Sequence, residues 1–172
     1  MPRVFIAVGS NLDPEENVVR GLQLLDAEVG IRRVSTFYRT PALDRPQDPP
    51  FANGVIEVGG EPGPFEMKAL LQRVESRLGR KRTEDRYAPR TLDLDLLLHG
   101  DQVLSSDGLT LPHPDIRARP FVAIPLLELA PDLILPDSGT PLRSIVDSLP
   151  PYPMEPIRDL TRRLRAEVAH GS

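Results

Sequence analysis

A run of alternating apolar and acidic residues constrains the fold of this chain more than any other feature. In the segment 92–98 leucine occupies every second position, and Asp93 and Asp95 fall between the leucines. A β-strand here would bury the leucines and present both carboxylates on its other face, roughly 7 Å apart. Because two like charges repel on a short apolar strand, the pattern favours a bound cation. A solvated strand face is the alternative interpretation.

The residues before this strand strengthen the first interpretation. Segment 80–90 contains five cationic side chains but only two acidic ones, Glu84 and Asp85. Guanidinium groups bind phosphate oxygens, and Mg²⁺ takes oxygen ligands while leaving positions open for substrate phosphates. An ordinary charged loop would also show such a run. Cations leading into paired carboxylates nevertheless supply both parts that phosphoryl transfer requires, so we predict a metal–nucleotide site.

Composition limits the class of protein. The 172 residues suffice for one domain with a substantial core. The formal net charge of -4 argues against a general nucleic-acid binder, and the lack of cysteine excludes disulfides and thiolate sites. The sequence shows neither a signal-peptide pattern nor an apolar run of membrane-spanning length. We therefore expect a cytoplasmic monomer with no nucleic-acid or membrane partner.

Hydrophobic periodicity predicts the elements. Strand-like residues form four segments: 4–8, 31–40, 51–58 and 92–98. Apolar residues recur at helical spacing in four other segments: 14–29, 64–78, 121–129 and 157–168. Asp13 is the expected side-chain cap of the first helix, and a hairpin turn at 99–102 is expected to lead into strand 103–105. The element order predicts an α+β, ferredoxin-like domain, with an antiparallel sheet and packed helices in three αβα layers.

Eight short motifs occur in a characteristic order along the chain. They are Gly9-Ser10-Asn11-Leu12, Phe37-Tyr38-Arg39-Thr40-Pro41, Phe51-Ala52-Asn53, Gln72-Arg73-Val74-Glu75, Gly79-Arg80, the run 86–95, Pro112-His113 and Arg119-Pro120-Phe121. Each motif alone is weak, but their joint order is highly specific. The chain thereby resembles the 6-hydroxymethyl-7,8-dihydropterin pyrophosphokinase family of folate biosynthesis. The resemblance implies transfer of diphosphate from ATP to the hydroxymethyl group of the pterin, with release of AMP.

The resemblance also implies roles for individual residues. Asp93 and Asp95 would hold two Mg²⁺ ions that bridge the triphosphate, and Arg82 and Arg90 would complete the catalytic set. The residues implied at the nucleotide are Gln72, Glu75, Arg80, Arg82, Arg90, Leu96, Thr110, His113 and Arg119. The residues implied at the pterin are Thr40, Pro41, Leu43, Phe51, Asn53 and Phe121.

Several of these residues also fit plainer roles. Phe51 and Phe121 would stack on the two faces of the pterin, although phenylalanines at such positions are otherwise core residues. Asn53 would form hydrogen bonds with the polar edge of the pterin, because its amide both donates and accepts hydrogen bonds. His113 could equally be structural, and a helix-flank residue such as Glu75 is commonly just solvated.

Three positions depart from the family pattern: Tyr87, Pro114 and Pro120. These departures leave open how the basic segment 80–90 closes over the site and how the nucleotide is contacted near residue 114. The resemblance implies a pyrophosphokinase domain over residues 1–148. We expect residues 149–172 to form a proline-rich connector and an amphipathic helix packed on the same domain.

Two other classes of protein fit parts of the sequence. A noncatalytic ferredoxin-like module that binds RNA or protein should carry exposed aromatic residues and a basic face, whereas this chain has few aromatic residues and a negative net charge. A different Asp-x-Asp transferase would use a sugar nucleotide. Release of AMP, instead of ADP or a nucleoside diphosphate, would separate these possibilities.

Overall fold

Alternating apolar side chains build one antiparallel sheet from strands distant in the sequence. A computed structural model of the protein describes residues 2–42, 47, 49–79 and 91–169. Its main sheet contains β1 (Val4–Ser10), β2 (Ile31–Val34), β3 (Tyr38–Thr40), β4 (Phe51–Val58), β5 (Asp93–His99) and β8 (Glu155–Pro156). The strand order is β5-β1-β4-β3-β8, and β2 pairs with the same edge of β4 as β3. Taking β2 and β3 as one interrupted strand gives the ferredoxin-like order that the sequence predicts.

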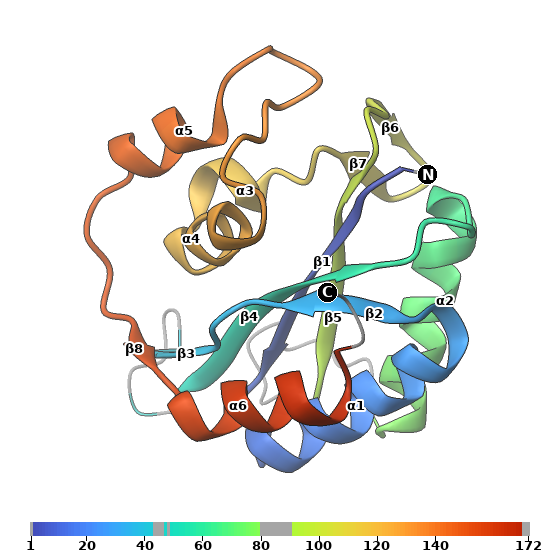
Figure 1. Ribbon diagram of the computed structural model, residues 1–172, viewed down its shortest axis with the longest axis vertical. Helices are drawn as coiled ribbons and strands as arrows, with labels where there is room; N and C mark the ends of the chain where they lie inside the picture. Colours follow the sequence, from blue (N-terminus) through green and yellow to red (C-terminus); the bar gives the residue numbers. More distant parts are fainter. Residues whose placement is uncertain (1, 43–46, 48, 80–90, 170–172) are drawn as a thin grey trace.

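Helices cover both faces of this sheet (Figure 1). They are α1 (Pro14–Val29), α2 (Pro64–Arg77), α3 (Asp115–Ala118), α4 (Pro120–Leu129), α5 (Leu142–Ser148) and α6 (Arg158–Glu167). Helices α1, α2 and α6 pack on one face, and α3, α4 and α5 pack on the other. None of the helices formed by the described residues has the length and apolar character that a membrane span requires.

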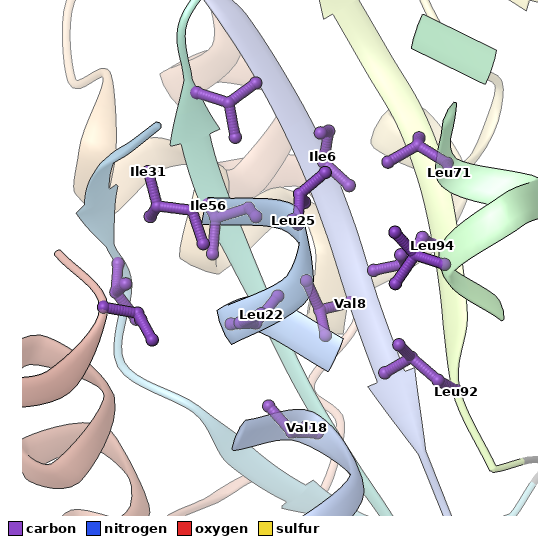
Figure 2. Packing of buried hydrophobic residues seen from close by; sticks show 14 of the residues in the cluster. Ile6, Val8, Val18, Leu22, Leu25, Ile31, Ile56, Leu71, Leu92 and Leu94 are labelled. Carbon is purple, nitrogen blue, oxygen red and sulfur yellow. The ribbon is translucent and has the colours of Figure 1, made fainter. Parts of the chain in front are cut away.

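Two apolar clusters, one on each face, hold the layers together. The larger cluster joins the sheet to α1 and α2 through side chains such as Ile6, Leu22 and Leu71 (Figure 2). Full burial of one such side chain stabilises the fold by about 1.5–3 kcal/mol. Leu94 of β5 also points into this cluster. Because successive side chains of a strand alternate, Asp93 and its neighbour two residues on must face the α4 side of the sheet.

The predicted turn at 99–102 is present, with the Gln102 backbone N–H donating to the His99 carbonyl at 3.2 Å, but the predicted hairpin pairing is wrong. In the described part of the chain β6 (Leu104–Ser106) pairs with β7 (Leu109–Leu111) in a separate two-stranded sheet, and β5 pairs with β1. The turn that joins β6 to β7 lies at Asp107 and Gly108, whose φ angles of 51° and 78° are both positive. Positive φ at both central residues is typical of the two-residue Asp-Gly hairpin turn. The Asp-Gly pair was therefore the correct signal.

Two other local predictions need correction. The first helix begins at Pro14 as predicted, but among the described residues Asp13 makes no side-chain capping bond. Its φ of 44° is left-handed, whereas a capping residue adopts an extended conformation. The expected single strand 31–40 is interrupted because Ser35 Oγ accepts a hydrogen bond from the Val55 backbone N–H at 2.9 Å, in place of a strand carbonyl.

The C-terminal segment joins the fold through both the sheet and the core. The amphipathic helix expected from periodicity is α6, and its Leu160 and Leu164 are buried in the same apolar cluster as α1. Helix α5 and strand β8 were not predicted. The division of the chain at residues 148 and 149 stays a prediction.

Candidate active site

The strand registers bring predicted site residues onto one face of the sheet. Asp93 lies opposite Gly9 of β1, and Gly9 lies opposite Asn53 of β4. Directly opposed residues point to the same side, so the Asp93 carboxylate and the Asn53 amide share a face at two strand spacings, about 10 Å. Asp95 lies opposite Ala7, on this same face. The sheet therefore carries both aspartates and the asparagine toward the α4 layer.

Asn53 is held in a defined position. Its Nδ2 donates a hydrogen bond to Thr40 Oγ1 at 2.8 Å. A Cβ atom on Gly9 would lie only 2.8 Å from Asn53 Oδ1, so a larger residue at that position would displace the amide. Phe51 is half-buried and lies opposite Thr40 in the β3–β4 pair. The structure thus groups three of the predicted pterin residues, and Pro41 follows directly as an exposed residue.

Phe121 comes from α4, on the same side of the sheet. It is half-buried at the second position of the helix. The Arg119 guanidinium carbon lies 5.7 Å from the Phe121 ring centroid, within the range of a cation–π contact. Pro120, one of the departures from the family pattern, is the first residue of α4, where its fixed φ suits a helix start. The helix that presents Phe121 is therefore compatible with the proline.

His113 lies beside β5. Its backbone N–H donates to the Leu97 carbonyl at 3.0 Å, and its Nδ1 accepts the Asp115 backbone N–H at 3.0 Å. Asp115 in turn places Oδ1 3.3 Å from Arg119 Nε. Asp115, which sequence reasoning missed, therefore contacts both predicted nucleotide residues, His113 through its backbone N–H and Arg119 through its carboxylate. The signal available was its position, two residues after the matched histidine.

Carboxylate oxygens dominate the groups that could hold a cation here. Asp95, His113 and Asp115 each offer one ligand atom, and these atoms lie within 4.8 Å of one another. Asp93 shares the face of Asp95. Oxygen donors suit Mg²⁺, which commonly binds through one or two carboxylates plus substrate phosphates. The donor set therefore fits the predicted metal.

Glu75 has a structural contact that the sequence did not predict. It is buried on α2, and its Oε2 accepts the backbone N–H of Leu94 at 2.8 Å. Leu94 lies between the two aspartates, so Glu75 anchors the strand that carries them. The predicted contact of Glu75 with the nucleotide stays a prediction.

The remaining predicted nucleotide residues lie on three different elements. Gln72 is exposed on α2, Thr110 is exposed on β7, and the Leu96 side chain is buried in the core on β5. Four predicted site residues and one departure lie outside the described residues: Leu43, Arg80, Arg82, Arg90 and Tyr87. Their roles stay predictions.

Tyr38 lies on the same face of the sheet as Asn53, and its sequence pattern did not indicate a role in the site. It lies opposite Asn53 in the β3–β4 pair. Burial raises the pKa of Tyr38, and the nearby charge of Glu128 raises that pKa further, while a hydrogen bond with the Thr36 side chain opposes the shift. The phenol therefore stays protonated at neutral pH and remains available as a hydrogen-bond donor.

The fold and this cluster define the class of protein: an α+β protein whose sheet presents carboxylates that could hold a metal ion beside an amide and aromatic rings. Residues 5–131 match the model of the 7,8-dihydro-6-hydroxymethylpterin-pyrophosphokinase family. The chain belongs to this family. The predicted family, fold class and enzyme class are thereby confirmed.

Relatives in two bacteria support this assignment. The chain is 39% identical over 161 residues to the 2-amino-4-hydroxy-6-hydroxymethyldihydropteridine pyrophosphokinase of Pseudomonas aeruginosa, covering 92% of this chain and 96% of that protein. It is 38% identical over 141 residues to the enzyme of the same name from Haemophilus influenzae, covering 80% of this chain and 88% of that protein.

A solved structure supports the fold. The crystal structure of wild-type Plasmodium falciparum HPPK-DHPS with pterin and p-hydroxybenzoate superposes with a TM-score of 0.68 at 11% identity. The match covers 96% of this chain but only 45% of that longer one.

Proposed function

We propose that this chain transfers the diphosphate of ATP to the hydroxymethyl group of 6-hydroxymethyl-7,8-dihydropterin, giving the pterin diphosphate and AMP in folate biosynthesis. Family membership supports the reaction, and ATP is the co-substrate. The observation that carries the proposal is the shared face of the sheet, where Asp93, Asp95 and Asn53 point toward the layer that holds Phe121.

The two β5 carboxylates are the proposed metal ligands. Asp93 and Asp95 would hold two Mg²⁺ ions, and Asp115 lies close enough to Asp95 to assist. Bound Mg²⁺ supplies charge neutralisation on the triphosphate and lowers the pKa of a coordinated hydroxyl group. Glu75 fixes the backbone between the two carboxylates, because it accepts the backbone N–H of Leu94.

The pterin would lie between aromatic rings. Phe51 and Phe121 would stack on its faces, because a flat heterocycle gains from offset contact with aromatic rings. Asn53 would read the edge of the ring through its carbonyl oxygen and any amide hydrogen not used by Thr40. Pro41 and Leu43 would contact the same ring through the backbone.

Arginine and histidine side chains would bind the phosphates. His113 lies near Asp95, and Arg119 lies beside Asp115; both would bind phosphate oxygens, together with Arg80, Arg82 and Arg90. The arginine charges would offset the negative charge that develops on the departing AMP and on the transferred group. Gln72, Leu96 and Thr110 complete the proposed nucleotide contacts.

We further infer that the enzyme acts as a cytoplasmic monomer, without a nucleic-acid or membrane partner. The net charge of -4 supports the lack of a nucleic-acid partner, since a general nucleic-acid binder is normally basic. Light scattering coupled to size-exclusion chromatography tests the oligomeric state, and a dimer mass would contradict it.

A nucleotide assay tests the reaction directly. The protein is incubated with ATP, Mg²⁺ and the reduced pterin, and the adenine nucleotides are separated. We expect AMP to form only when the pterin is present. Formation of ADP would indicate single phosphoryl transfer, and no pterin-dependent nucleotide product would overturn the proposal.

A further inference from the structure

A residue beyond the matched family segment contacts the proposed pterin site. Tyr152 lies in the connector between α5 and β8, outside residues 5–131. Its ring centroid lies 5.7 Å from that of Phe121, with the two planes inclined at 49°. This separation and tilt are within the favourable range for an aromatic pair. The ring proposed to stack on the pterin is therefore supported by a side chain from the C-terminal segment.

The connector that carries Tyr152 is fixed at both ends. At one end α5 buries Leu142 in the cluster on the α4 face. At the other end β8 pairs with β3, and the Ile157 backbone N–H donates to the Phe37 carbonyl at 2.8 Å. Figure 1 shows the connector passing down the side of the molecule from α5 to β8. Because both anchors belong to the folded body, the position of Tyr152 is set by the fold.

The C-terminal segment also binds the residue that precedes β3. Thr161 of α6 accepts the Phe37 backbone N–H at 2.9 Å, so the C-terminal segment binds both backbone groups of Phe37. Phe37 directly precedes β3, which carries the Thr40 hydroxyl that accepts from Asn53. The C-terminal segment thus contacts Phe121 directly and supports the strand whose Thr40 holds the Asn53 amide.

The phenol of Tyr152 stays protonated, and therefore uncharged, at neutral pH. Burial raises the pKa of the Tyr152 phenol, and the charge of Arg119 only partly opposes that shift. A protonated phenol retains the full ring contact with Phe121 at neutral pH. Arg119 also contacts the Phe121 ring, so the phenylalanine is held by two neighbours.

We infer that Tyr152 is a positioning residue of the pterin site, which acts by holding the Phe121 ring at the angle needed for stacking on the pterin. This inference rests on the proposed function. Tyr152 need not touch the substrate, since its effect is transmitted through Phe121. It should therefore influence pterin binding selectively and leave the nucleotide affinity nearly unchanged.

Three variants test this role. Tyr152→Ala removes the ring, Tyr152→Phe keeps the ring without the hydroxyl, and Pro151→Ala changes the exposed neighbouring position of the same connector. Equilibrium titration with the pterin and, separately, with MgATP gives the two affinities. We expect Tyr152→Ala to weaken pterin binding about two- to tenfold, the range of an aromatic pair. Tyr152→Phe and Pro151→Ala should bind like the wild type.

A double-mutant cycle separates this role from general damage. If Tyr152 acts through Phe121, then Tyr152→Ala has little further effect on pterin affinity in a Phe121→Ala background. An equal loss in both backgrounds, unchanged pterin affinity in Tyr152→Ala, or parallel weakening of MgATP would overturn the inference. A wild-type protein that binds no pterin would overturn the proposed function as well, so the two failures are distinguishable.

Discussion

The two aspartates of β5 are the residues on which the proposed chemistry most depends. We predict that Asp93→Asn and Asp95→Asn each reduce turnover at least about 10²-fold, because loss of one charged ligand impairs both phosphate positioning and charge neutralisation. Steady-state AMP formation measures the effect, and circular dichroism checks the fold. Asp101→Asn, an exposed carboxylate in the turn after β5, is the matched control. Near-normal turnover in a folded Asp93 or Asp95 variant would refute the metal assignment.

Gly9 controls the position of the Asn53 amide. In Gly9→Ala the new Cβ would meet Asn53 Oδ1 at 2.8 Å, so the flexible side chain must move. We predict up to about tenfold weaker pterin binding, the value of one hydrogen bond, with MgATP binding preserved. Calorimetric titration of each ligand measures this. Gly63→Ala is the control, because a Cβ there meets nothing within 4 Å in the described chain. Equal pterin affinity in both variants would argue against the Asn53 role.

At the scale of elements, β5 depends on a contact from α2. Glu75→Ala would leave the buried Leu94 N–H without its carboxylate acceptor, which should lower the free energy of unfolding by about 1–3 kcal/mol. Glu75→Gln retains an acceptor oxygen and should lose much less. Urea denaturation measures both variants. If Glu75→Ala keeps wild-type stability and loses only ATP affinity, Glu75 is a nucleotide ligand and not an anchor of the strand.

The elements that sequence reasoning predicted are those encoded by local periodicity. The leucine alternation around Asp93 and the helical stripe that ends at Gly30 depend on neighbours within a few residues. The Asp13 cap and the hairpin turn are local errors, whereas two other features depend on a distant contact. Ser35 interrupts a strand because its hydroxyl meets Val55, and β8 exists only because β3 offers an edge.

The candidate site was likewise predictable from the sequence only in part. The shared face of Asp93 and Asn53 follows from strand alternation, which the leucine pattern predicts, together with the strand order of the ferredoxin-like fold, which the element order predicts. The contact of Asp115 with Arg119 joins residues four apart and was missed although it is local. The contact of Tyr152 with Phe121 could not be predicted, because it depends on how the connector packs against α4 in three dimensions. The nucleotide contact of Glu75 stays a prediction, and its buried contact with Leu94 could not be predicted from the helix pattern.

At the scale of the whole molecule, the C-terminal helix should unfold together with the sheet. Leu164 is fully buried in the cluster that also contains α1 side chains. We predict that Leu164→Ala lowers the free energy of unfolding by about 2–5 kcal/mol while a single transition is retained. Arg162→Ala, an exposed change on the same helix, should stay within about 0.5 kcal/mol of the wild type. Separate transitions by fluorescence and circular dichroism would show that residues 149–172 are an independent unit.

The fate of the β-phosphorus of ATP tests the central claim most directly. The enzyme is incubated with ATP labelled at the β-position, Mg²⁺ and 6-hydroxymethyl-7,8-dihydropterin, and the labelled products are separated. Diphosphate transfer predicts that the β-label moves to the pterin product in a one-to-one ratio with unlabelled AMP. Retention of the β-label in ADP, or no pterin-dependent movement of the label, would contradict the assignment of this chain as a pyrophosphokinase.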